Sequence, residues 1–360
     1  MKKKILIIAN DSVGLHLFRS ELIKKLSENS EVTALCPDTG FTEELTQIGC
    51  HFLSQKMERR GMNPIKDFEL LLDYIRVIRE KKPDLVITYT VKPNAYGGIA
   101  CQMCGVPYAV NVTGLGTAFQ GNGMLRKFVT GLYKIAFRRA KVVFFENEEN
   151  RDIIVEAGII GKDRTHVLHG AGVDLKKFSY IEYPKEDRIT RFLFVGRVMK
   201  EKGVNELFEA MRRLRADGLD CTLDILGSFD EDYSEKIEAA KSEDWLTYYG
   251  YQPDVKPFIE RCHCFVLPSW HEGMANTNLE SAASGRPVIT SNIHGCMEAV
   301  ENGVTGFLCE KKNAEDLYCV MKKFAELPYE QRKAMGLAGR KRMEMIFDKK
   351  KVVEETISHL

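Results

Sequence analysis

HEGMANTNLESAASGRPVI, residues 271–289, places two glutamates, Glu272 and Glu280, on either side of a run of small and amide residues. The stretch before it, HCFVLPSW, and the stretch that ends it, GRPVITS, both have the short apolar pattern of buried strands. Glu272 is then expected on a strand-to-helix turn, and Glu280 in the first turn of an Ala/Ser-rich helix. In an open parallel sheet, ligands bind at this end of a strand. The stretch therefore predicts an α/β fold with a ligand site at the carboxyl edge of a sheet.

The same alternation of strand and helix extends through the rest of the chain. KILIIA, DLVITYT and KVVFFE have strand patterns, whereas PIKDFELLLDYIRVIREKK has helical spacing. Short strands separated by helices predict parallel sheets with right-handed crossovers. The chain is therefore expected to be built from doubly wound α/β units.

A break in this pattern indicates two domains. The stretch from Lys176 to Thr190 is charged and lacks clean periodicity, which is typical of a linker, and the strand-like RFLFVG follows it. At 360 residues the chain also exceeds the usual size of one domain. We expect two Rossmann-like, doubly wound domains, residues 1–178 and 179–345, that face a central cleft. The helical tail, about 346–360, is expected to pack back on the first domain.

The composition is that of an ordinary protein of a reducing compartment. The formal net charge is +1, which gives no overall field to attract nucleic acid. The 10 cysteines are scattered rather than spaced as a disulfide framework. No apolar run reaches the ~18 residues that span a bilayer, and the apolar run of MKKKILIIAN is expected to be the first strand rather than a signal peptide. The sequence predicts a cytoplasmic protein or one that lies on a membrane surface.

The residues around the two glutamates suit a ligand with phosphates and hydroxyl groups. GMANT supplies backbone N–H groups at a helix start, where an anion is stabilised. Glu280 can accept hydrogen bonds from two adjacent hydroxyls, as on a ribose, and Glu272 can accept from hydroxyls beyond the phosphates. Ribose, diphosphate and sugar in a row describe a nucleotide sugar. The alternative is that Glu280 only completes a capping box with Thr277.

Positive charge for a diphosphate is available in FVGRVMKEKGVNEL. Arg197 and Lys202 follow the first strand of the second domain, and Gly203 lets the backbone approach closely. Arg can bind two phosphate oxygens at once, whereas Lys acts as a point charge. Most Arg and Lys side chains are solvated surface residues, which is the alternative for both. Their position at the carboxyl edge of a strand favours the binding role.

Together these motifs resemble the GT-B retaining glycosyltransferases of the GT4 type. Glu272 and Glu280 match the E-x7-E pattern of that family, and Gly14 in NDSVGLHLFR matches its first-domain glycine loop. The chain is also similar to bacterial enzymes that extend polyprenyl-diphosphate-linked sugars for capsule, O-antigen or protein glycans. The motifs that carry these resemblances are GR…EKG (196–203), PSW.EG……E (268–280), SGRPVI (284–289), NGVTGFL (302–308), VKPNAYGGIA, NVTGLGTAF and ERRGMNP.

The resemblance implies an enzyme that moves a sugar, with retention, from a nucleotide sugar to a glycan acceptor, and the donor is expected to be a UDP-sugar. Arg197 and Lys202 would hold the donor diphosphate and stabilise the leaving nucleotide. Glu280 would bind the ribose hydroxyls and Glu272 the donor sugar. Further donor contacts are expected from Gly14, from the backbone amides of Gly273, Met274, Ala275 and Asn276, and, for uracil, from Tyr251 and Gln252.

One departure from the family pattern concerns the acceptor. Many members carry a histidine after the strand read here as YAVNVTG, where this chain has Thr113 and Gly114. The family's front-face mechanism does not require that histidine, because the donor phosphate can accept the acceptor proton. Thr113 is expected on the acceptor side. His16, close to Gly14, is a candidate substitute, and its alternative is an ordinary polar helix residue.

The sequence predicts neither a metal nor a cofactor. CQMC lies in a helical apolar pattern, and the cysteines of RCHCFVLPS are expected to act as small apolar residues at the entry to a buried strand. No nucleotide-bound cation is expected, so Arg197 and Lys202 would have to supply the positive charge. The residues weighed as metal ligands are Cys101, Cys104, Cys262, His263, Cys264 and His271.

Two basic stretches of the first domain suggest how a lipid-linked or oligosaccharide acceptor is bound. Arg59 and Arg60, with Lys56 nearby, are expected to hold an acceptor diphosphate. Residues 123–141 predict a helix that could lie on an anionic membrane at the inner face of the cell membrane. The alternative is a helix that packs on its own sheet with a solvated basic face. Its expected apolar stripe is Leu125, Phe128, Val129, Leu132 and Ala136, and its basic residues are Arg126, Lys127, Lys134, Arg138 and Arg139.

Three other function classes share this architecture. A nonhydrolysing sugar-nucleotide epimerase and a phosphorylase also use two such domains, although no lysine-anchored cofactor site is apparent for a phosphorylase. A non-catalytic nucleotide-binding subunit is the third, and the full set of Arg197, Lys202, Glu272 and Glu280 disfavours it. A glycosyltransferase remains the expected function.

Overall fold

The structure is a computed structural model that describes residues 2–57, 63–116, 119 and 123–360. The chain forms two compact units. The first unit contains Met1–Ala171 and Lys350–Leu360, and the second contains Gly172–Lys349. The change of unit thus falls between Ala171 and Gly172, ahead of the charged stretch that the sequence analysis took as the linker. The last helix belongs to the first unit.

Seven parallel strands form the sheet of the first unit, in the order β3-β2-β1-β4-β5-β6-β7. The strands are β1 (Lys3–Ile8), β2 (Ser30–Cys36), β3 (Cys50–Ser54), β4 (Leu85–Tyr89), β5 (Tyr108–Val112), β6 (Val142–Phe145) and β7 (Thr165–Val167). The helices are α1 (Ser12–Asn29), α2 (Thr42–Gln47), α3 (Pro64–Lys81), the π-helix η1 (Pro93–Gly97), α4 (Gly98–Cys104), α5 (Met124–Phe137), α6 (Glu148–Glu156), the short 3-10 turn η3 (Lys162–Arg164) and α13 (Lys349–His359).

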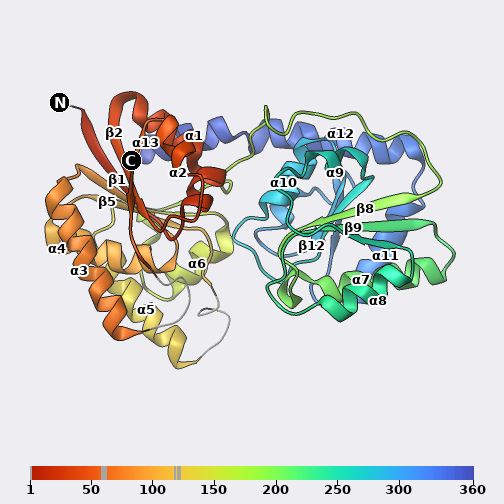
Figure 1. The fold of residues 1–360 in the computed structure, drawn as a ribbon, viewed down its shortest axis with the longest axis horizontal. Coiled ribbons are helices and arrows are strands. Elements are labelled where there is room, and N and C mark those ends of the chain that lie inside the picture. Colours follow the sequence, from red (N-terminus) through yellow and green to blue (C-terminus); the bar gives the residue numbers. More distant parts are fainter. Residues whose placement is uncertain (1, 58–62, 117–118, 120–122) are drawn as a thin grey trace. The chain divides into compact units, whose positions relative to one another are not determined.

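Both faces of this sheet are covered by helices, as Figure 1 shows. Along β1, Ile5 and Ile7 pack with α1, α2 and α13, whereas Leu6 and Ile8 pack with α3, α4 and α5. Successive side chains of a strand point to opposite faces, so a strand covered on both sides must be apolar throughout. The continuous apolar run ILII in β1 agrees with this burial on both faces.

The second unit is built in the same way from six parallel strands, in the order β10-β9-β8-β11-β12-β13. The strands are β8 (Thr190–Val195), β9 (Cys221–Leu226), β10 (Leu246–Tyr248), β11 (Cys264–Leu267), β12 (Val288–Ser291) and β13 (Gly306–Cys309). The helices are the short η4 (Lys200–Lys202), α7 (Val204–Ala216), α8 (Ser234–Ser242), α9 (Lys256–Arg261), α10 (Asn276–Ala283), the short η5 (Met297–Ala299), α11 (Ala314–Ala325) and α12 (Tyr329–Ile346).

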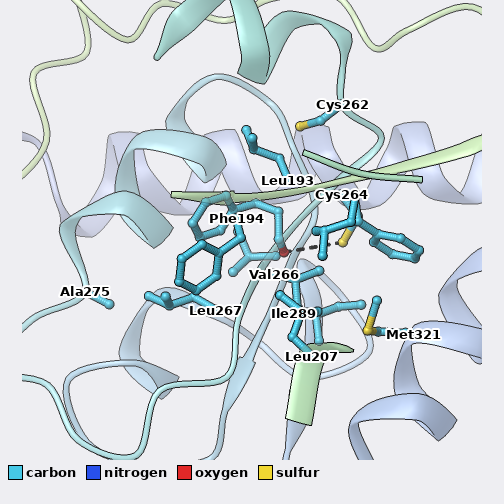
Figure 2. Close-up of a cluster of buried hydrophobic side chains, with 14 of the residues drawn as sticks. Leu193, Phe194, Leu207, Cys262, Cys264, Val266, Leu267, Ala275, Ile289 and Met321 are labelled. Atoms are coloured by element: carbon cyan, nitrogen blue, oxygen red, sulfur yellow. Dashed lines mark hydrogen bonds between the residues drawn. The ribbon is translucent and has the colours of Figure 1, made fainter. Parts of the chain in front are cut away.

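The core of the second unit packs around the central strands β8 and β11. Figure 2 shows Leu193 and Phe194 of β8 beside Val266 and Leu267 of β11, with Ile289 of β12 next to them. All five side chains are at most 1% exposed. This rigid centre ends at the loops that follow β8 and β11, and it therefore fixes where those loops begin.

The structure confirms the expected parallel sheets and adds detail that the sequence analysis missed. Strands β7 and β10, each three residues long, had not been expected. Such short edge strands carry too few residues to show a period-2 pattern. The tail is not one helix, because α12 ends at Ile346 and α13 begins at Lys349.

Each sheet has one point at which its strand order reverses. In the first unit the reversal lies between β1 and β4, and in the second it lies between β8 and β11. The loops after these neighbouring strands leave in opposite directions, which opens a ligand-binding position at the carboxyl ends of the strands. We call these positions the first and second switch points.

Candidate active site

The second switch point brings the loops after β8 and β11 into close contact. Gly203, at the start of α7, has a φ angle of +73°, and a Cβ atom there would lie 2.1 Å from the carbonyl oxygen of Pro268. Any side chain would therefore force the β8 loop away from the β11 loop. Glycine is required at this position both for its conformation and for the close approach.

This approach joins Lys202 to Glu272 in an ion pair. The Glu272 carboxylate also accepts a hydrogen bond of 2.8 Å from the hydroxyl of Ser269. The two charged side chains are 18% and 13% exposed, so they are largely shielded but can be reached by a ligand. The sequence had predicted both residues as parts of one donor site, and the structure places them in direct contact.

Arg197, the other predicted cation, has a different neighbour. Its guanidinium donates a 2.8 Å hydrogen bond to the carboxylate of Asp230, which follows β9, and the arginine side chain is 53% exposed. A surface pair of this kind contributes little to stability. Arg197 can therefore leave Asp230 for a stronger partner at little cost, but its role in donor binding stays a prediction.

Helix α10 begins without a side-chain cap. Its first residue is Asn276, and the residue before it, Ala275, makes no capping side-chain hydrogen bond. Thr277 therefore lies inside the helix, and the capping-box explanation of Glu280 is wrong. The Ala275 amide donates to the Gly295 carbonyl and the Asn276 amide to that of Met274, so two of the four predicted donor-binding amides are engaged within the protein.

Glu280 lies one turn into α10 in a largely buried setting. Burial raises the pKa of its carboxyl group to about 7, and the positive charges of Lys177 and Lys349 lower it by a smaller amount. A carboxyl group with such a pKa is only partly ionised at neutral pH. Perturbed carboxyl groups of this kind are common at functional sites, which fits the predicted ribose contact without testing it.

A third loop, after β12, supports the same site and was missed by the sequence analysis. A Cβ atom on Gly295 would lie 2.6 Å from the carbonyl oxygen of Glu272, so this loop lies directly against the Glu272 backbone. The Glu298 carboxylate accepts from the Gly295 amide at 2.7 Å and contacts His294 at 2.9 Å. Glu298 thereby holds the loop that supports Glu272. The glycine in IHGCMEAV was the only signal in the sequence.

The residues predicted to bind uracil lie beyond β10. Tyr251 is 66% exposed, and the Gln252 side chain donates a 2.8 Å hydrogen bond to the Tyr249 carbonyl. An exposed ring is available for stacking on a base, but this geometry does not single out Tyr251. Their role stays a prediction.

In the first unit, Gly14 lies in a helix rather than in a loop. It is within α1, and its amide donates to the carboxylate of Asp11, the N-cap residue. A Cβ atom on Gly14 would lie 2.9 Å from that carboxylate, so the glycine accommodates the cap. The loop geometry expected for Gly14 is therefore wrong. The His16 ring stacks on Phe41, with 4.6 Å between centroids, as an ordinary packed helix residue would.

Thr113, at the position of the family's histidine, lies beside a charged pair that the sequence analysis missed. Together with Arg19 and Glu146 it lines a narrow cavity at the carboxyl ends of β5 and β6. Arg19 and Glu146 are 127 positions apart and form a 2.7 Å ion pair, a contact that no local motif could reveal. The predicted acceptor residues Arg59 and Arg60 lie outside the described residues.

The cysteines and histidines weighed as metal ligands form no metal site in the part of the chain that the structure describes. Cys262 and Cys264 are buried, and burial raises the pKa of the Cys262 thiol to about 12. His263 is 1% exposed, and its Nδ1 accepts a hydrogen bond from the Arg191 amide. These residues are core components, in line with their expected apolar role.

The predicted membrane helix corresponds to α5, but its apolar residues are divided differently. The buried residues are Val129, Tyr133, Ala136 and Phe137, whereas Leu125 and Phe128 of the expected stripe are exposed. The expected single stripe is therefore wrong. The helix uses one apolar row to pack on its sheet and presents a second to solvent.

Comparisons with known families agree with this architecture. Residues 179–342 match the family described as glycosyl transferases group 1, and residues 4–147 match the family described as glycosyl transferase 4-like. The two matches fall in the second and first unit, respectively.

Relatives of similar length are bacterial glycosyltransferases. An N,N'-diacetylbacillosaminyl-diphospho-undecaprenol alpha-1,3-N-acetylgalactosaminyltransferase of Campylobacter jejuni is 27% identical over 87% of each chain. The capsular polysaccharide biosynthesis glycosyltransferase CapM of Staphylococcus aureus is 25% identical over 98% of this chain and 95% of its own. A UDP-Gal:alpha-D-GlcNAc-diphosphoundecaprenol alpha-1,3-galactosyltransferase of Escherichia coli is 26% identical over 79% of this chain and 77% of its own.

Solved structures show the same fold. HepE of Anabaena, in complex with UDP-glucose, superposes with a TM-score of 0.81 at 19% identity, over 99% of this chain and 100% of its own. Sucrose-phosphate synthase of Thermosynechococcus elongatus superposes with a TM-score of 0.79 at 17% identity, over 99% and 98% of the two chains. The chain is therefore a glycosyltransferase of the GT-B fold, whose first unit matches the glycosyl transferase 4-like family and whose second unit matches the glycosyl transferases of group 1.

Proposed function

We propose that this glycosyltransferase moves a sugar from a UDP-sugar, with retention, to a polyprenyl-diphosphate-linked glycan in the synthesis of a surface polysaccharide or glycoconjugate. The observation that carries the donor half is the Lys202–Glu272 ion pair at the second switch point, with Glu280 on α10, the helix that follows β11. The acceptor half is supported by the relatives from Campylobacter jejuni and Escherichia coli, whose names specify diphosphoundecaprenol-linked acceptors. The HepE complex supports UDP as the nucleotide.

The Lys202–Glu272 pair suits a donor that carries both phosphates and hydroxyls. In the free protein each charge neutralises the other in a largely shielded position. A donor diphosphate would attract the Lys202 ammonium, and the donor sugar hydroxyls would donate to Glu272. The ligand thus replaces one favourable pair with two charge-assisted contacts, which are stronger than neutral hydrogen bonds.

Retention follows when the acceptor attacks from the side that the nucleotide leaves. The bond between the anomeric carbon and the donor phosphate oxygen breaks, and a bond to the acceptor oxygen forms on the same face. The acceptor hydroxyl gives its proton to the departing diphosphate. Lys202, with Arg197 if it leaves Asp230, would stabilise the negative charge that develops on the nucleotide. No cofactor enters this proposal.

The charge state of Glu280 bears on ribose binding. A carboxylate accepts hydrogen bonds from two neighbouring hydroxyls, whereas a protonated carboxyl group must use one oxygen as a donor. Because burial raises the pKa of Glu280 to about 7, the proposed role requires loss of a proton near neutral pH. UDP-sugar binding should therefore weaken as the pH falls below about 7.

We also propose that the first unit rests on the inner face of the cell membrane through an apolar face on α3, α4 and α5. These helices lie side by side on one face of the sheet (Figure 1). Eight large apolar side chains on these helices are exposed, and Met124 is the most exposed of them, at 88%. These eight side chains, which define the apolar face, are Ile65, Phe68, Leu72, Met103, Met124, Leu125, Phe128 and Ile135.

Charge on α5 favours an anionic membrane as the partner of the apolar face. Lys127, Lys134, Arg138 and Arg139 are exposed on or just after this helix. Basic side chains beside buried apolar ones are the usual composition of a surface-bound helix. No helix in the described ranges is long and apolar enough to cross a bilayer, so the proposed contact is peripheral.

The decisive experiment is a transfer assay that follows the product. Purified protein is incubated with a panel of UDP- and GDP-sugars and a polyprenyl-diphosphate-linked N-acetylglucosamine, and the anomeric configuration of the product is read by NMR. We expect UDP-sugar-dependent transfer with the donor's configuration kept. Inversion, or transfer from GDP-sugars alone, would contradict the proposal. Conversion of the UDP-sugar to its epimer without transfer would favour the epimerase class instead.

A further inference from the structure

The first switch point contains a charged cluster to which donor binding assigns no role. Arg19 of α1 and Glu146, which follows β6, form an ion pair whose side chains are only 10% and 11% exposed. Removing two charges from water is costly, and a buried pair is weak evidence for stability. A pair retained at the ligand-binding edge of a sheet therefore calls for a functional explanation.

Tyr89, the last residue of β4, supplies an independent sign of a ligand. The Arg19 guanidinium lies 4.9 Å from the centre of the Tyr89 ring. Tyr89 is 3% exposed, and its hydroxyl has no hydrogen-bond partner among the described residues. Burial raises the pKa of that hydroxyl, the positive charge of Arg19 lowers it, and the negative charge of Glu146 raises it. A buried hydroxyl without a hydrogen-bond partner destabilises the folded protein.

The turn that follows Tyr89 has an unusual backbone conformation. Thr90 has a φ angle of +73°, which is rare for a β-branched residue. The π-helix η1 follows within a few residues, and such helices often mark functional sites. Strain of this kind persists only where the surroundings enforce it.

A second ion pair holds this turn in place. The Lys92 ammonium contacts one oxygen of Asp67 at 2.8 Å, and the Tyr96 hydroxyl donates to the other at 3.1 Å. Asp67 lies in the first turn of α3, so these bonds tie the β4 turn to that helix. Lys92 and Asp67 therefore position the turn, whereas Arg19 lines the cavity that also contains Thr113.

We propose that Arg19, Glu146 and Tyr89 form a subsite that binds the hydroxyl groups of the acceptor's reacting sugar and orients it for attack. This inference rests on the proposed transfer to a glycan. It assigns to the Arg19–Glu146 pair the acceptor-orienting task that the residue at position 113 does not supply, because Thr113 lines the same narrow cavity. Lys92 and Asp67 act as positioning residues.

The chemistry of the cluster favours a neutral sugar over a phosphate. Glu146 balances the charge of Arg19, so the pair presents no net positive charge to an anion. Arg19 has five N–H donors, of which its hydrogen bond to Glu146 uses one. The carboxylate and the Tyr89 hydroxyl add acceptors beside these donors. Sugar hydroxyls both donate and accept, which matches such a mixed set.

Tyr89→Phe is the sharpest test, because it removes only the hydroxyl. If the hydroxyl binds acceptor, the variant should raise the KM for polyprenyl-diphosphate-linked N-acetylglucosamine about tenfold, the scale of one lost hydrogen bond in a desolvated site. Glu146→Gln should do the same. The rate of UDP release from the donor in the absence of acceptor should not change. Tyr74→Phe is the matched control, because Tyr74 is buried in the same unit and its hydroxyl contacts Met57.

A binding measurement separates this inference from the proposed function. Methyl α-N-acetylglucosaminide and inorganic diphosphate are titrated separately by ligand-observed NMR into the wild type, Tyr89→Phe and Tyr74→Phe. We expect the glycoside to bind about tenfold more weakly to Tyr89→Phe alone, with diphosphate binding the same in all three. That result would support the subsite even if no UDP-sugar is turned over.

Two results would overturn the subsite. Equal glycoside affinity in the wild type and Tyr89→Phe, with a higher melting temperature in the variant, would mean that the hydroxyl is merely an unpaired buried group. Stronger binding of diphosphate than of glycoside at this position, lost in Arg19→Gln, would mean that it takes an anion instead.

Discussion

The two switch points hold similar charges but differ in how they are assembled. At the second, Lys202 and Glu272 come from adjacent loops after β8 and β11, and the pair is 18% and 13% exposed. At the first, Arg19 and Glu146 come from α1 and the end of β6 and are 10% and 11% exposed, with a strained turn and a second pair, Lys92–Asp67, nearby. Both occur where a doubly wound sheet offers a ligand position.

This difference suggests two kinds of recognition. At the second switch point, Lys202 is proposed to exchange its partner Glu272 for a phosphate, and Glu280 on the following helix α10 has a pKa of about 7 because it is buried. The first holds its charges balanced and shielded, which suits neutral hydroxyls. As proposed, the same fold serves a charged donor in one unit and a sugar acceptor in the other, because the side chains at the strand ends differ.

The largest expected effect tests the donor side of this comparison. Lys202→Ala should lower turnover at saturating donor by about 100-fold, the scale of one lost transition-state donor. Lys200→Ala is the matched control, because Lys200 lies two residues earlier in the same short helix and is exposed. Initial rates of UDP release would measure both. Turnover close to that of the wild type in Lys202→Ala would remove its assigned role.

The next effect tests whether the Lys92–Asp67 pair is a positioning element. Lys92→Met keeps the apolar stem but leaves the Asp67 carboxylate buried without its cation. The free energy of unfolding should fall by about 2 kcal/mol near pH 8, less than for a fully buried pair because Lys92 is 14% exposed.

A pH series supplies the check on this prediction. An uncompensated buried carboxyl group binds a proton more readily when folded, so the loss should shrink as the pH falls towards 5. Urea unfolding at several pH values would measure it. A loss that is constant with pH would point to packing rather than charge.

A smaller effect is expected for Glu280→Gln. The change keeps the size of the side chain but weakens acceptance from ribose hydroxyls. Charge-assisted hydrogen bonds contribute roughly 1.5–3 kcal/mol, so the Kd for the UDP-sugar should rise by about tenfold at pH 8. The difference should narrow below pH 7, where the wild-type carboxyl group is itself protonated. Calorimetric titration with UDP at both pH values measures this.

Although Glu280→Gln should weaken UDP-sugar binding, it should increase the stability of the folded protein, and this second effect serves as an internal control. The folded pKa of Glu280 lies near 7, above the ordinary value of 4.5. Its stabilising contribution is therefore complete below about pH 4.5 and is lost as the pH rises through 7. Glu280→Gln cannot lose a proton, so at pH 8 it should be more stable than the wild type by on the order of 1 kcal/mol. A less stable variant would show that Glu280 is a structural residue.

The smallest expected effect is on liposome binding, and it tests whether the first unit alone contacts the membrane. Arg138→Ala with Arg139→Ala should weaken flotation with anionic liposomes about fivefold, or about 1 kcal/mol for the pair, because each basic residue near the surface contributes at most about 1 kcal/mol and salt screens it. Lys236→Ala with Lys241→Ala, on α8 of the second unit, removes the same charge as a control. Equal losses in both pairs would refute the assignment to α5. A wild type that stays unbound at low salt would refute the membrane proposal itself.

Much of the second switch point was predictable because its residues lie in compact motifs. Lys202 and Glu272 follow strands whose patterns are visible in the sequence, and Glu280 lies in the helix that comes next. The position of a strand end relative to its sheet is almost fixed by parallel topology. Glu298 was missed because it acts on the site only through Gly295, which is too indirect for a local pattern.

The first switch point was mostly invisible in the sequence. Arg19 looks like any basic residue of an amphipathic helix, and Glu146 like the end of any strand. The motif VKPNAYGGIA was noticed, but nothing in it indicates that Lys92 would meet Asp67, 25 positions earlier. Likewise, the exposure of Phe128 depends on how α5 rotates against its sheet.

The sequence by itself determined that this protein consists of two doubly wound α/β units, because strand and helix periodicities are local properties of the chain. It also determined the loops that carry the donor residues. Only the tertiary structure decided which charges meet, as with Lys202 and Glu272 or Arg19 and Glu146. The reason is physical: the strength of an ion pair and the pKa of a carboxyl group depend on distance and burial in three dimensions. Both distance and burial are set only when the sheets form and place distant strand ends side by side.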